Sequence, residues 1–421
     1  MFRIVKHVKI TLSCCITIKR LKIFNISCVF SVSVSASRDL ASLTYEVGAL
    51  EYDDFKPSAE PVYILGTKYS TLHELDDLRS DVTSKIWLTY RRNFPAISGT
   101  DYTSDTGWGC MLRCGQMAVA EALMRRHLRR GWQWAPGIRD ESYLRVLRMF
   151  QDKKNCTFSI HQIAQMGVSE GKAVGQWFGP NTVAHVLRKL AAFDKWSSLA
   201  IHVAMDNVVI MDDIRKVCRL EATAESGVRN RAEPAGLAAA AAESWKPLLL
   251  FIPLRLGLSE INPIYYCGLK RTFALKQSLG IIGGKPNHAL YIIGVVGDDL
   301  VFLDPHTTQL AVDLDTEFPD DESYHCAHAS RMDIGQLDPS IALCFYLPTE
   351  AEFDSWCNLA HKHLISEMSQ PLFEITEHRP LGWPDFVDEE QRLDQEPQTA
   401  DFTVLEQERK YDTSDDEFEI I

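Results

Sequence analysis

The sequence has no apolar run long enough to cross a membrane and no pair of cysteines at the spacing of a zinc ribbon. A membrane-spanning helix needs about 20 consecutive apolar residues, and every apolar stretch of this 421-residue chain is shorter. The eleven cysteines are odd in number and include no CxxC pair, so the sequence supports neither a disulfide framework nor a structural zinc site. These absences favour a cytoplasmic protein with reduced, mostly buried thiols and no cofactor.

Acidic residues are absent from the start of the chain and concentrated at its end. The formal net charge is −13. Residues 1–38 contain Lys and Arg but no Asp or Glu, whereas residues 385–421 carry far more acidic than basic side chains. The middle part is acidic as well. Because nucleic acids are polyanions, an acidic body argues against a nucleic-acid ligand.

Three residues close together are of metal-ligating types but do not form a recognisable metal motif. His325, Cys326 and His328 have the spacing of no usual tetrahedral site, and no second half of a ligand set is evident. We therefore expect no metal in this protein.

Composition divides the chain into three parts. With 46% hydrophobic and 24% charged residues, it can bury a large core, and we expect one folded unit over residues 41–383. Residues 1–40 are basic and then apolar, which permits a secretory signal, a mitochondrial leader or a divergent segment outside the fold. Residues 384–421 are polar and acidic, which predicts a disordered, flexible tail.

Local patterns predict an α+β fold in which a helical half faces an antiparallel sheet. Helices are predicted over residues 111–130 and 181–192, the second with a proline at its start. Residues 221–245 are rich in alanine and predict an insertion loop. Short apolar runs predict strands at residues 62–65, 246–254, 289–296, 300–303 and 341–347.

A thiol at the start of a helix is the most informative chemical feature. Residues 107–110 read Gly-Trp-Gly-Cys, directly before the first predicted helix. The free N–H groups and the positive dipole end of a helix stabilise thiolate, the reactive species. Far along the chain, Asp304 and His306 end a strand-like run, where both side chains lie on one face. Together with Cys110 they form the arrangement of a thiol protease.

Five longer segments stand in one order along the chain: YRRNFPAI at 90–97, SDTGWGCMLRCGQM at 104–117, GQWFGPNT at 175–182, GGKPN at 283–287 and DPHTTQ at 304–309. Together they resemble the autophagin family. The resemblance covers residues 44–347 and resumes at the carboxyl end. It implies a papain-like cysteine endopeptidase of autophagy, which trims the carboxyl terminus of GABARAP-type ubiquitin-like modifiers and releases them from phosphatidylethanolamine.

The resemblance also implies catalytic roles. Cys110 would be the nucleophile, His306 the base and Asp304 the group that orients His306. In papain an Asn after the His takes the place of the acid, whereas here the Asp precedes the His; the roles can agree, because triads are recognised by geometry. Tyr90 matches a family tyrosine whose hydroxyl, with the backbone N–H of Cys110, would stabilise the oxyanion.

Two further segments resemble the lid over the family's substrate channel. Trp177 would clamp a groove so narrow that only glycine passes, and residues 275–284 would form a regulatory loop. Gly280, Gly283 and Gly284 are expected as hinges. Lys276 stands where relatives have a proline, so we expect the stiffness of this loop to differ.

The acidic tail ends in a motif for binding the modifier. Phe418 and Ile421, preceded by acids, resemble a GABARAP-interacting motif, in which an extended peptide adds a strand to the modifier. Residues 402–405 are a weaker copy, and residues 45–48 resemble a similar motif but lack its aliphatic anchor. Ser414 precedes three acids, and its phosphorylation would add charge that strengthens docking.

Two other classes of function stay open. A modifier-binding adaptor would keep the groove and the tail motif but have lost turnover. An unrelated thiol enzyme such as a transglutaminase would share the Cys, His and Asp but transfer acyl groups to amines. Cys114, one helical turn after Cys110, has the position for redox control, although we expect it to be a small core residue. We expect a monomer that meets membranes only through its lipid-linked substrate.

Overall fold

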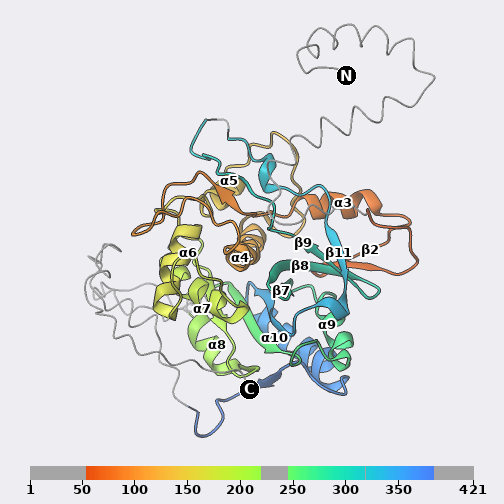
Figure 1. Cartoon of the computed structure of the whole chain (residues 1–421). Helices are drawn as coiled ribbons and strands as arrows, with labels where there is room; N and C mark the ends of the chain where they lie inside the picture. Colours follow the sequence, from red (N-terminus) through yellow and green to blue (C-terminus); the bar gives the residue numbers. More distant parts are fainter. Residues whose placement is uncertain (1–53, 220–244, 318, 384–421) are drawn as a thin grey trace, which may run out of the picture.

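The computed structural model describes residues 54–219, 245–317 and 319–383 (Figure 1). The predicted leader and tail, with Phe418, Ile421 and Ser414, lie outside these residues, as does the insertion loop up to its last residue. The proposed borders of the three parts therefore stay predictions. In the described part, no helix is both long and apolar enough to span a bilayer.

Helices lie on both sides of a central sheet (Figure 1). The helices predicted at 111–130 and 181–192 are confirmed as α4 and α7, and α7 begins at Pro180, whose fixed φ suits a first turn. The helix bounds are α3 Leu75–Thr83, α4 Cys110–Leu128, α5 Glu141–Arg148, α6 Ile160–Met166, α7 Pro180–Ala191, α8 Met211–Cys218, α9 Tyr266–Thr272 and α10 Glu350–Ala360.

The main sheet runs in the order β11-β9-β8-β7-β12-β6-β4, with β1 pairing β8 and β2 pairing β1. Its pairs are antiparallel except β4 with β6. Every predicted strand is confirmed in position. Outside the main sheet, β10 pairs with β3 and β13 with β5, both in parallel. The strand bounds are β1 Val62–Ile64, β2 Thr67–Tyr69, β3 Arg91–Arg92, β4 Ala200–Val203, β5 Val208–Ile210, β6 Leu248–Arg255, β7 Ser278–Lys285, β8 His288–Val296, β9 Asp299–Leu303, β10 Gln309–Leu310, β11 Ser330–Asp333, β12 Ser340–Leu347 and β13 Glu374–Thr376.

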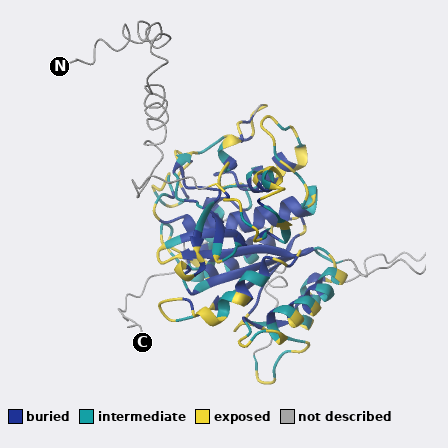
Figure 2. Ribbon diagram, turned by 90° about the vertical axis from the view of Figure 1, so that its right-hand side faces the viewer, coloured by how far each residue is buried: buried dark blue, intermediate teal, exposed yellow. Residues whose placement is uncertain are grey.

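Both faces of the sheet are buried, as the dark centre of Figure 2 shows. Leu249 and Phe251 of β6 pack in the cluster that contains α4, while Leu248 and Leu250 pack in the opposite cluster with Trp356 of α10. A strand covered on both faces is apolar throughout, which explains the uninterrupted apolar runs of β6 and β12. The second layer, built by α8, α9 and α10, was not predicted from the sequence.

Helix α4 lies at the centre of the helical half and contacts β7, β8, α5, α6 and α7. Every residue from Cys110 to Arg125 is buried, so the helix is enclosed on all sides and not on one face only. Gly115 allows α7 to approach closely, because a Cβ there would lie 2.8 Å from Val183 and 2.9 Å from Leu187. The axis of α4 is thereby fixed against both the sheet and α7.

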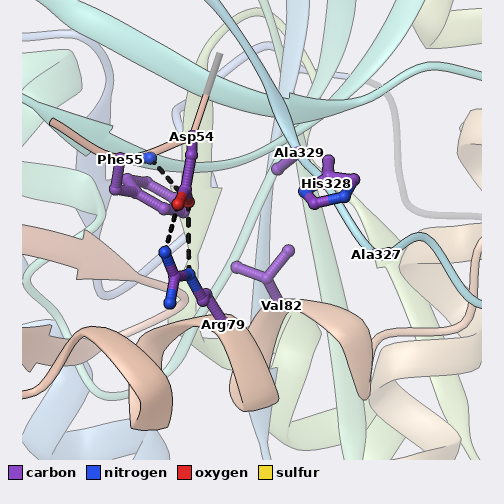
Figure 3. Close-up of a pocket in the computed structure, with 7 residues that line it drawn as sticks. All are labelled: Asp54, Phe55, Arg79, Val82, Ala327, His328 and Ala329. Atoms are coloured by element: carbon purple, nitrogen blue, oxygen red, sulfur yellow. Dashed lines mark hydrogen bonds and ion pairs between the residues drawn. The ribbon is translucent and has the colours of Figure 1, made fainter. Parts of the chain in front are cut away.

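A small pocket lies where the described chain begins (Figure 3). Asp54 forms an ion pair with Arg79 of α3, and Phe55 is buried beside them. Ala327, His328 and Ala329, just before β11, close the other side. This contact fastens the incoming segment to the edge of the sheet. Its lining contains no thiol, and we assign it no chemistry.

Candidate active site

The turn before α4 is built around the buried carboxylate of Asp105. The backbone N–H groups of Trp108 and Gly109 donate to the Asp105 carbonyl oxygen at 3.2 and 2.9 Å. Gly107 has a φ of +86°, and a Cβ on Gly109 would lie 2.3 Å from Asp105 Oδ2. Both positions therefore require glycine. The turn places Cys110 as the first residue of α4, where the helix dipole favours thiolate.

The buried side chain of Arg113 connects this turn to α4 through ion pairs. The guanidinium of Arg113 is fully buried and lies 2.8 Å from Asp105 and 2.9 Å from Asp152. Burial alone would lower the pKa of Arg113, but the two carboxylates outweigh burial and raise it. Arg113 is therefore charged and joins three segments: the turn, α4 and the loop after α5.

Asp304 and His306 follow β9 and face each other. His306 Nδ1 lies 2.5 Å from Asp304 Oδ1, and the His306 backbone N–H donates to the same oxygen at 2.9 Å. The indole N–H of Trp87 donates to the Asp304 carbonyl oxygen at 2.7 Å. With Nδ1 committed to Asp304, the other ring nitrogen of His306 is directed to the Cys110 thiol, with which it forms a side-chain hydrogen bond.

Electrostatics favour a thiolate–imidazolium pair. Burial alone would raise the pKa of the Cys110 thiol, but the contact with His306 outweighs it and holds this pKa below its usual value. Burial alone would lower the pKa of His306, but the Asp304 carboxylate and the Cys110 sulfur raise it to about 9. The neighbouring His288 and the hydrogen-bonded His306 hold the pKa of Asp304 well below its usual range despite burial.

Tyr90 lies beside both members of this pair. Its backbone N–H donates to the Pro305 carbonyl oxygen at 2.8 Å, and its ring meets the His306 ring edge-on, with centroids 5.4 Å apart and an interplanar angle of 86°. Burial and the Cys110 sulfur raise the pKa of Tyr90. Its hydroxyl therefore stays protonated, within hydrogen-bonding reach of Cys110, in a place suited to the predicted oxyanion donor.

Two groups from the start of β8 belong to the same constellation, and the sequence interpretation missed them. The His288 ring stacks on the His306 ring, and the backbone N–H of Ala289 forms a hydrogen bond to Cys110. The available signal was the family segment at 283–287, which ends directly before His288. Trp87 was missed as well, because a lone tryptophan before a motif carries no signal of its own.

Three groups here could be considered as metal ligands. Within the described ranges, ligand-type atoms of His288, Asp304 and His306 all lie within 4.8 Å of one another. The two imidazole rings, however, stack with centroids 3.5 Å apart and an interplanar angle of 9°. An imidazole binds a metal through a nitrogen lone pair in its ring plane, and two rings stacked in this way do not both point at one ion. The geometry therefore suits acid–base chemistry better than metal binding.

The predicted regulatory loop at 275–284 is wrong in conformation and place. Most of this segment, including Gly283 and Gly284, belongs to β7, which is buried between β8 and β12. The glycines serve close packing and not hinging: a Cβ on Gly284 would lie 2.1 Å from the His288 carbonyl oxygen. The loop next to the site is instead the two-residue turn between β7 and β8, Pro286 and Asn287.

Lys276 lies at the far end of β7 from the site. Arg125 Nη1 donates to the Lys276 carbonyl oxygen at 3.1 Å, and Arg125 is about 22 Å along α4 from Cys110 at 1.5 Å per residue. The Lys276 ammonium forms an ion pair with Glu352 at 2.9 Å. A gating role for Lys276 is therefore not supported by its position.

Trp177 lies in the loop before α7, and its side chain is 42% exposed. Gly175, with a φ of +87°, packs so closely on Tyr102 that a Cβ would lie 2.6 Å from the Tyr102 ring. The Tyr102 ring in turn lies 5.7 Å from that of Trp108, two residues before Cys110. The Trp177 loop is thus connected to the nucleophile turn, while its gating role stays a prediction.

The other residues singled out from the sequence have local partners. The buried His325 ring bonds Tyr143 and the Thr83 carbonyl oxygen, both at 2.8 Å, and Cys326 donates to the His328 carbonyl oxygen at 2.9 Å. The Cys114 side chain is buried in the main core, and burial raises the pKa of its thiol. This environment suits the expected core residue, because a thiol so rarely ionised reacts slowly.

Comparisons with known proteins agree with this geometry. Residues 75–359 match the family model described as the peptidase C54 catalytic domain. The chain is 50% identical over 408 residues to cysteine protease ATG4B of Gallus gallus, and this match covers 91% of the chain and 99% of the relative. It is 50% identical over 390 residues to cysteine protease ATG4B of Xenopus laevis, with coverage of 91% and 99%. With cysteine protease ATG4A of Homo sapiens it shares 48% identity over 346 residues, or 80% of this chain and 86% of the relative.

Proposed function

The chain belongs to the peptidase C54 family of cysteine proteases, and we propose that it cleaves after a glycine near the carboxyl end of GABARAP-type ubiquitin-like modifiers. The observation that carries the proposal is the contact of Cys110, at the start of α4, with His306, which bonds Asp304. The sequence resemblance of the five motif segments supplies the substrate class.

The proposed reaction passes through an acyl-enzyme. The Cys110 sulfur attacks the glycine carbonyl carbon, and the carbonyl electron pair moves to oxygen, where Tyr90 and the Cys110 backbone N–H donate to it. Collapse breaks the C–N bond, and the leaving amine takes a proton from His306. Water then adds to the thioester and gives its proton to His306, which restores the thiolate and frees a glycine carboxylate.

The burial of the nucleophile supports a preference for glycine. Cys110 is only 2% exposed, Tyr90 3% and Trp108 7%. A peptide bond that reaches the Cys110 sulfur must pass between these groups, and a residue without a side chain brings its backbone closest. We propose that Trp177 forms part of the entrance, together with the turn between β7 and β8.

Two substrates share this chemistry. The unprocessed precursor and the conjugate with phosphatidylethanolamine both present a glycine carbonyl bonded to nitrogen, so one acyl-enzyme serves trimming and release from lipid. We propose that the protein acts in the cytoplasm as a monomer and meets membranes through the conjugate. The tail motif with Phe418 and Ile421 would hold the modifier by strand addition.

A covalent trap tests the nucleophile and the glycine preference together. A GABARAP-type modifier that carries a vinyl sulfone in place of its scissile glycine carbonyl is incubated with the full chain, and the adduct is mapped by peptide mass spectrometry. We expect modification of Cys110 in the wild-type chain and none in Cys110→Ala. A second probe, in which leucine replaces the terminal glycine, should react far more slowly. An adduct on the exposed Cys267 instead, or equal rates for both probes, would contradict the proposal.

Vesicles that carry the conjugate of the modifier with phosphatidylethanolamine test the second reaction. We expect the wild-type chain to release soluble modifier ending in glycine, and Cys110→Ala to leave it on the membrane. Trimming of the precursor without any release from vesicles would limit the function to precursor processing.

A further inference from the structure

His288, the first residue of β8, contacts Asp304 and His306 from a side that the proposed reaction does not use. The His288 ring lies flat on the His306 ring, with centroids 3.5 Å apart, and His288 Nε2 lies 3.6 Å from Asp304 Oδ2. Its side chain is 39% exposed. None of the catalytic roles assigned above involves this second imidazole.

We propose that His288 is a positioning residue that holds Asp304 and His306 in their working geometry. The inference rests on the proposed roles of Cys110, Asp304 and His306. It assigns His288 no contact with the Cys110 sulfur or the substrate. His288 lies near the Asp304 side of the His306 ring, and the ring nitrogen that faces Cys110 is on the other side.

The first part of the argument concerns the two oxygens of Asp304. Oδ1 accepts from both the ring and the backbone of His306, which leaves Oδ2 to fix the plane of the carboxylate. His288 is the side chain that faces Oδ2. A carboxylate that has an imidazole nitrogen near each oxygen is less free to turn toward water, so the His306 ring keeps its orientation.

The second part concerns the His306 ring itself. Tyr90 meets it edge-on at 5.4 Å, and His288 covers one of its faces. Contacts on one face and at one edge restrict the tilt and rotation of the His306 ring. Rotation of the ring away from Cys110 would break the stack and the Asp304 hydrogen bond together.

The backbone of His288 is itself well fixed. His288 pairs with Lys285 at the end of the β7–β8 hairpin, and Asn287 in the two-residue turn has a φ of 59°, which asparagine tolerates. The next residue, Ala289, contacts Cys110 through its backbone N–H. The start of β8 therefore supports all three members of the proposed triad at once.

The test compares His288→Ala with His288→Phe, which keeps a flat ring but cannot bond Asp304. One readout is steady-state cleavage of the modifier precursor. The other is the pH dependence of iodoacetamide labelling on the peptide that contains Cys110, which needs no substrate. The other titratable groups next to Cys110, Asp304 and His306, which stay unchanged in both variants, are Tyr90, Cys114 and Cys326.

For His288→Ala we expect kcat to fall about 10- to 100-fold, the loss typical of removing an outer partner that orients an active-site group, with KM changed less than about twofold. The labelling midpoint should move to higher pH by about one unit, because a weaker Asp304–His306 pair supports less thiolate. His288→Phe should lie between Ala and wild type. The exposed His73→Ala is the matched control and should equal wild type.

Wild-type kcat and an unshifted labelling profile in both His288 variants would overturn the inference. A rise in KM alone would also overturn it, since His288 would then contact substrate. If His288→Ala does not fold, as judged by circular dichroism, the Phe variant of similar shape decides. A wild-type chain that labels normally but cleaves no modifier would refute the proposed function and leave the labelling test of His288 valid.

Discussion

Single residues from distant parts of the sequence set one another's charge at the site. Cys110 and His306 are the two halves of an ion pair, and Asp304 holds the positive half in place. The thiol pKa is lowered and the imidazole pKa is raised for the same reason: each charge stabilises the other in a place that water hardly reaches. Tyr90 stays neutral beside them as a donor.

This coupling predicts a pH profile. The thiolate–imidazolium form exists above the lowered pKa of Cys110 and below the raised pKa of His306, so kcat/KM should fall as the pH rises through about 9. Asp304→Asn removes the charge that raises the His306 pKa, so the alkaline limb should move to lower pH and the rate should drop. Cleavage of a modifier precursor across pH 5–10 measures both effects. All buffers of the series have the same ionic strength of about 0.15 M. An alkaline limb that stays in place in Asp304→Asn would contradict this coupling.

Tyr90 allows a second prediction about a single side chain. Tyr90→Phe removes only the hydroxyl, and loss of one oxyanion donor typically costs about 10² to 10³ in kcat. We therefore expect such a fall with little change in KM, measured by steady-state cleavage. Tyr63→Phe on β1 is the control and should leave kcat unchanged. An effect on KM alone would assign Tyr90 to substrate binding instead.

Among the elements, the turn before α4 has the narrowest tolerance. A Cβ on Gly109 would meet the Asp105 carboxylate at 2.3 Å, so Gly109→Ala must move Asp105 or Cys110. We expect about 1–3 kcal/mol of destabilisation from overpacking and loss of most activity, measured by denaturant unfolding and precursor cleavage. Gly131→Ala, where a Cβ meets nothing within 4 Å, should leave the activity unchanged. Full activity of Gly109→Ala would show that the turn is less constrained than its contacts imply.

The buried ion pairs of Arg113 give a separate prediction for stability. Arg113→Met leaves the Asp105 carboxylate buried without its cation, and breaking a buried pair typically costs about 3–5 kcal/mol. The control is Lys270→Met at the surface pair with Asp298, whose side chains are 35% and 69% exposed and for which the loss should be at most about 1 kcal/mol. Urea unfolding measures both. Equal losses in the two variants would contradict a special role for Arg113.

The strands and the two main helices were predictable because their signals are local. An uninterrupted apolar run such as β12 and the proline at the start of α7 specify their elements without distant contacts. The family match confirms the autophagin resemblance, the papain-like α+β class and the cysteine peptidase class. The lid was misplaced because glycines read as hinges on sequence grounds also serve close backbone contacts, as Gly284 does.

The position of Cys110 ahead of α4 was predictable in the same local way, whereas the support of the site was not. His288 and Trp87 act through contacts across sheet and loop that no spacing rule reveals. The second helical layer escaped prediction because α8, α9 and α10 are shorter than α4 and α7, and their place depends on the far face of the sheet.

For the whole molecule, we propose that residues 54–383 and the acidic residues after them have separate tasks. The described chain ends beyond β13, which pairs with β5, and Arg379 forms an ion pair with Asp213 of α8. The residues that follow carry the acidic motif expected to hold the modifier. Catalysis and capture of the modifier should therefore respond to different substitutions.

This separation predicts the effect of the tail. Replacing both Phe418 and Ile421 by Ala should weaken binding of the modifier about 10-fold or more, as loss of buried anchor residues usually does, while the rate of Cys110 labelling stays unchanged. Isothermal titration with the mature modifier measures the binding. The matched control replaces Phe402 and Leu405, the weaker copy, and should change affinity much less. Equal losses in both variants would point to the acidic charge and not to the anchors.

The most direct test of the central claim is cleavage of a GABARAP-type precursor that carries a reporter after its glycine, by wild type and by Cys110→Ala. We predict that wild type releases the reporter at that glycine and leaves a modifier with a free glycine carboxylate, whereas Cys110→Ala binds the precursor and releases nothing. Release by both proteins would exclude Cys110 as the nucleophile. Binding without release by wild type would contradict the protease account of this substrate and favour a modifier-binding adaptor.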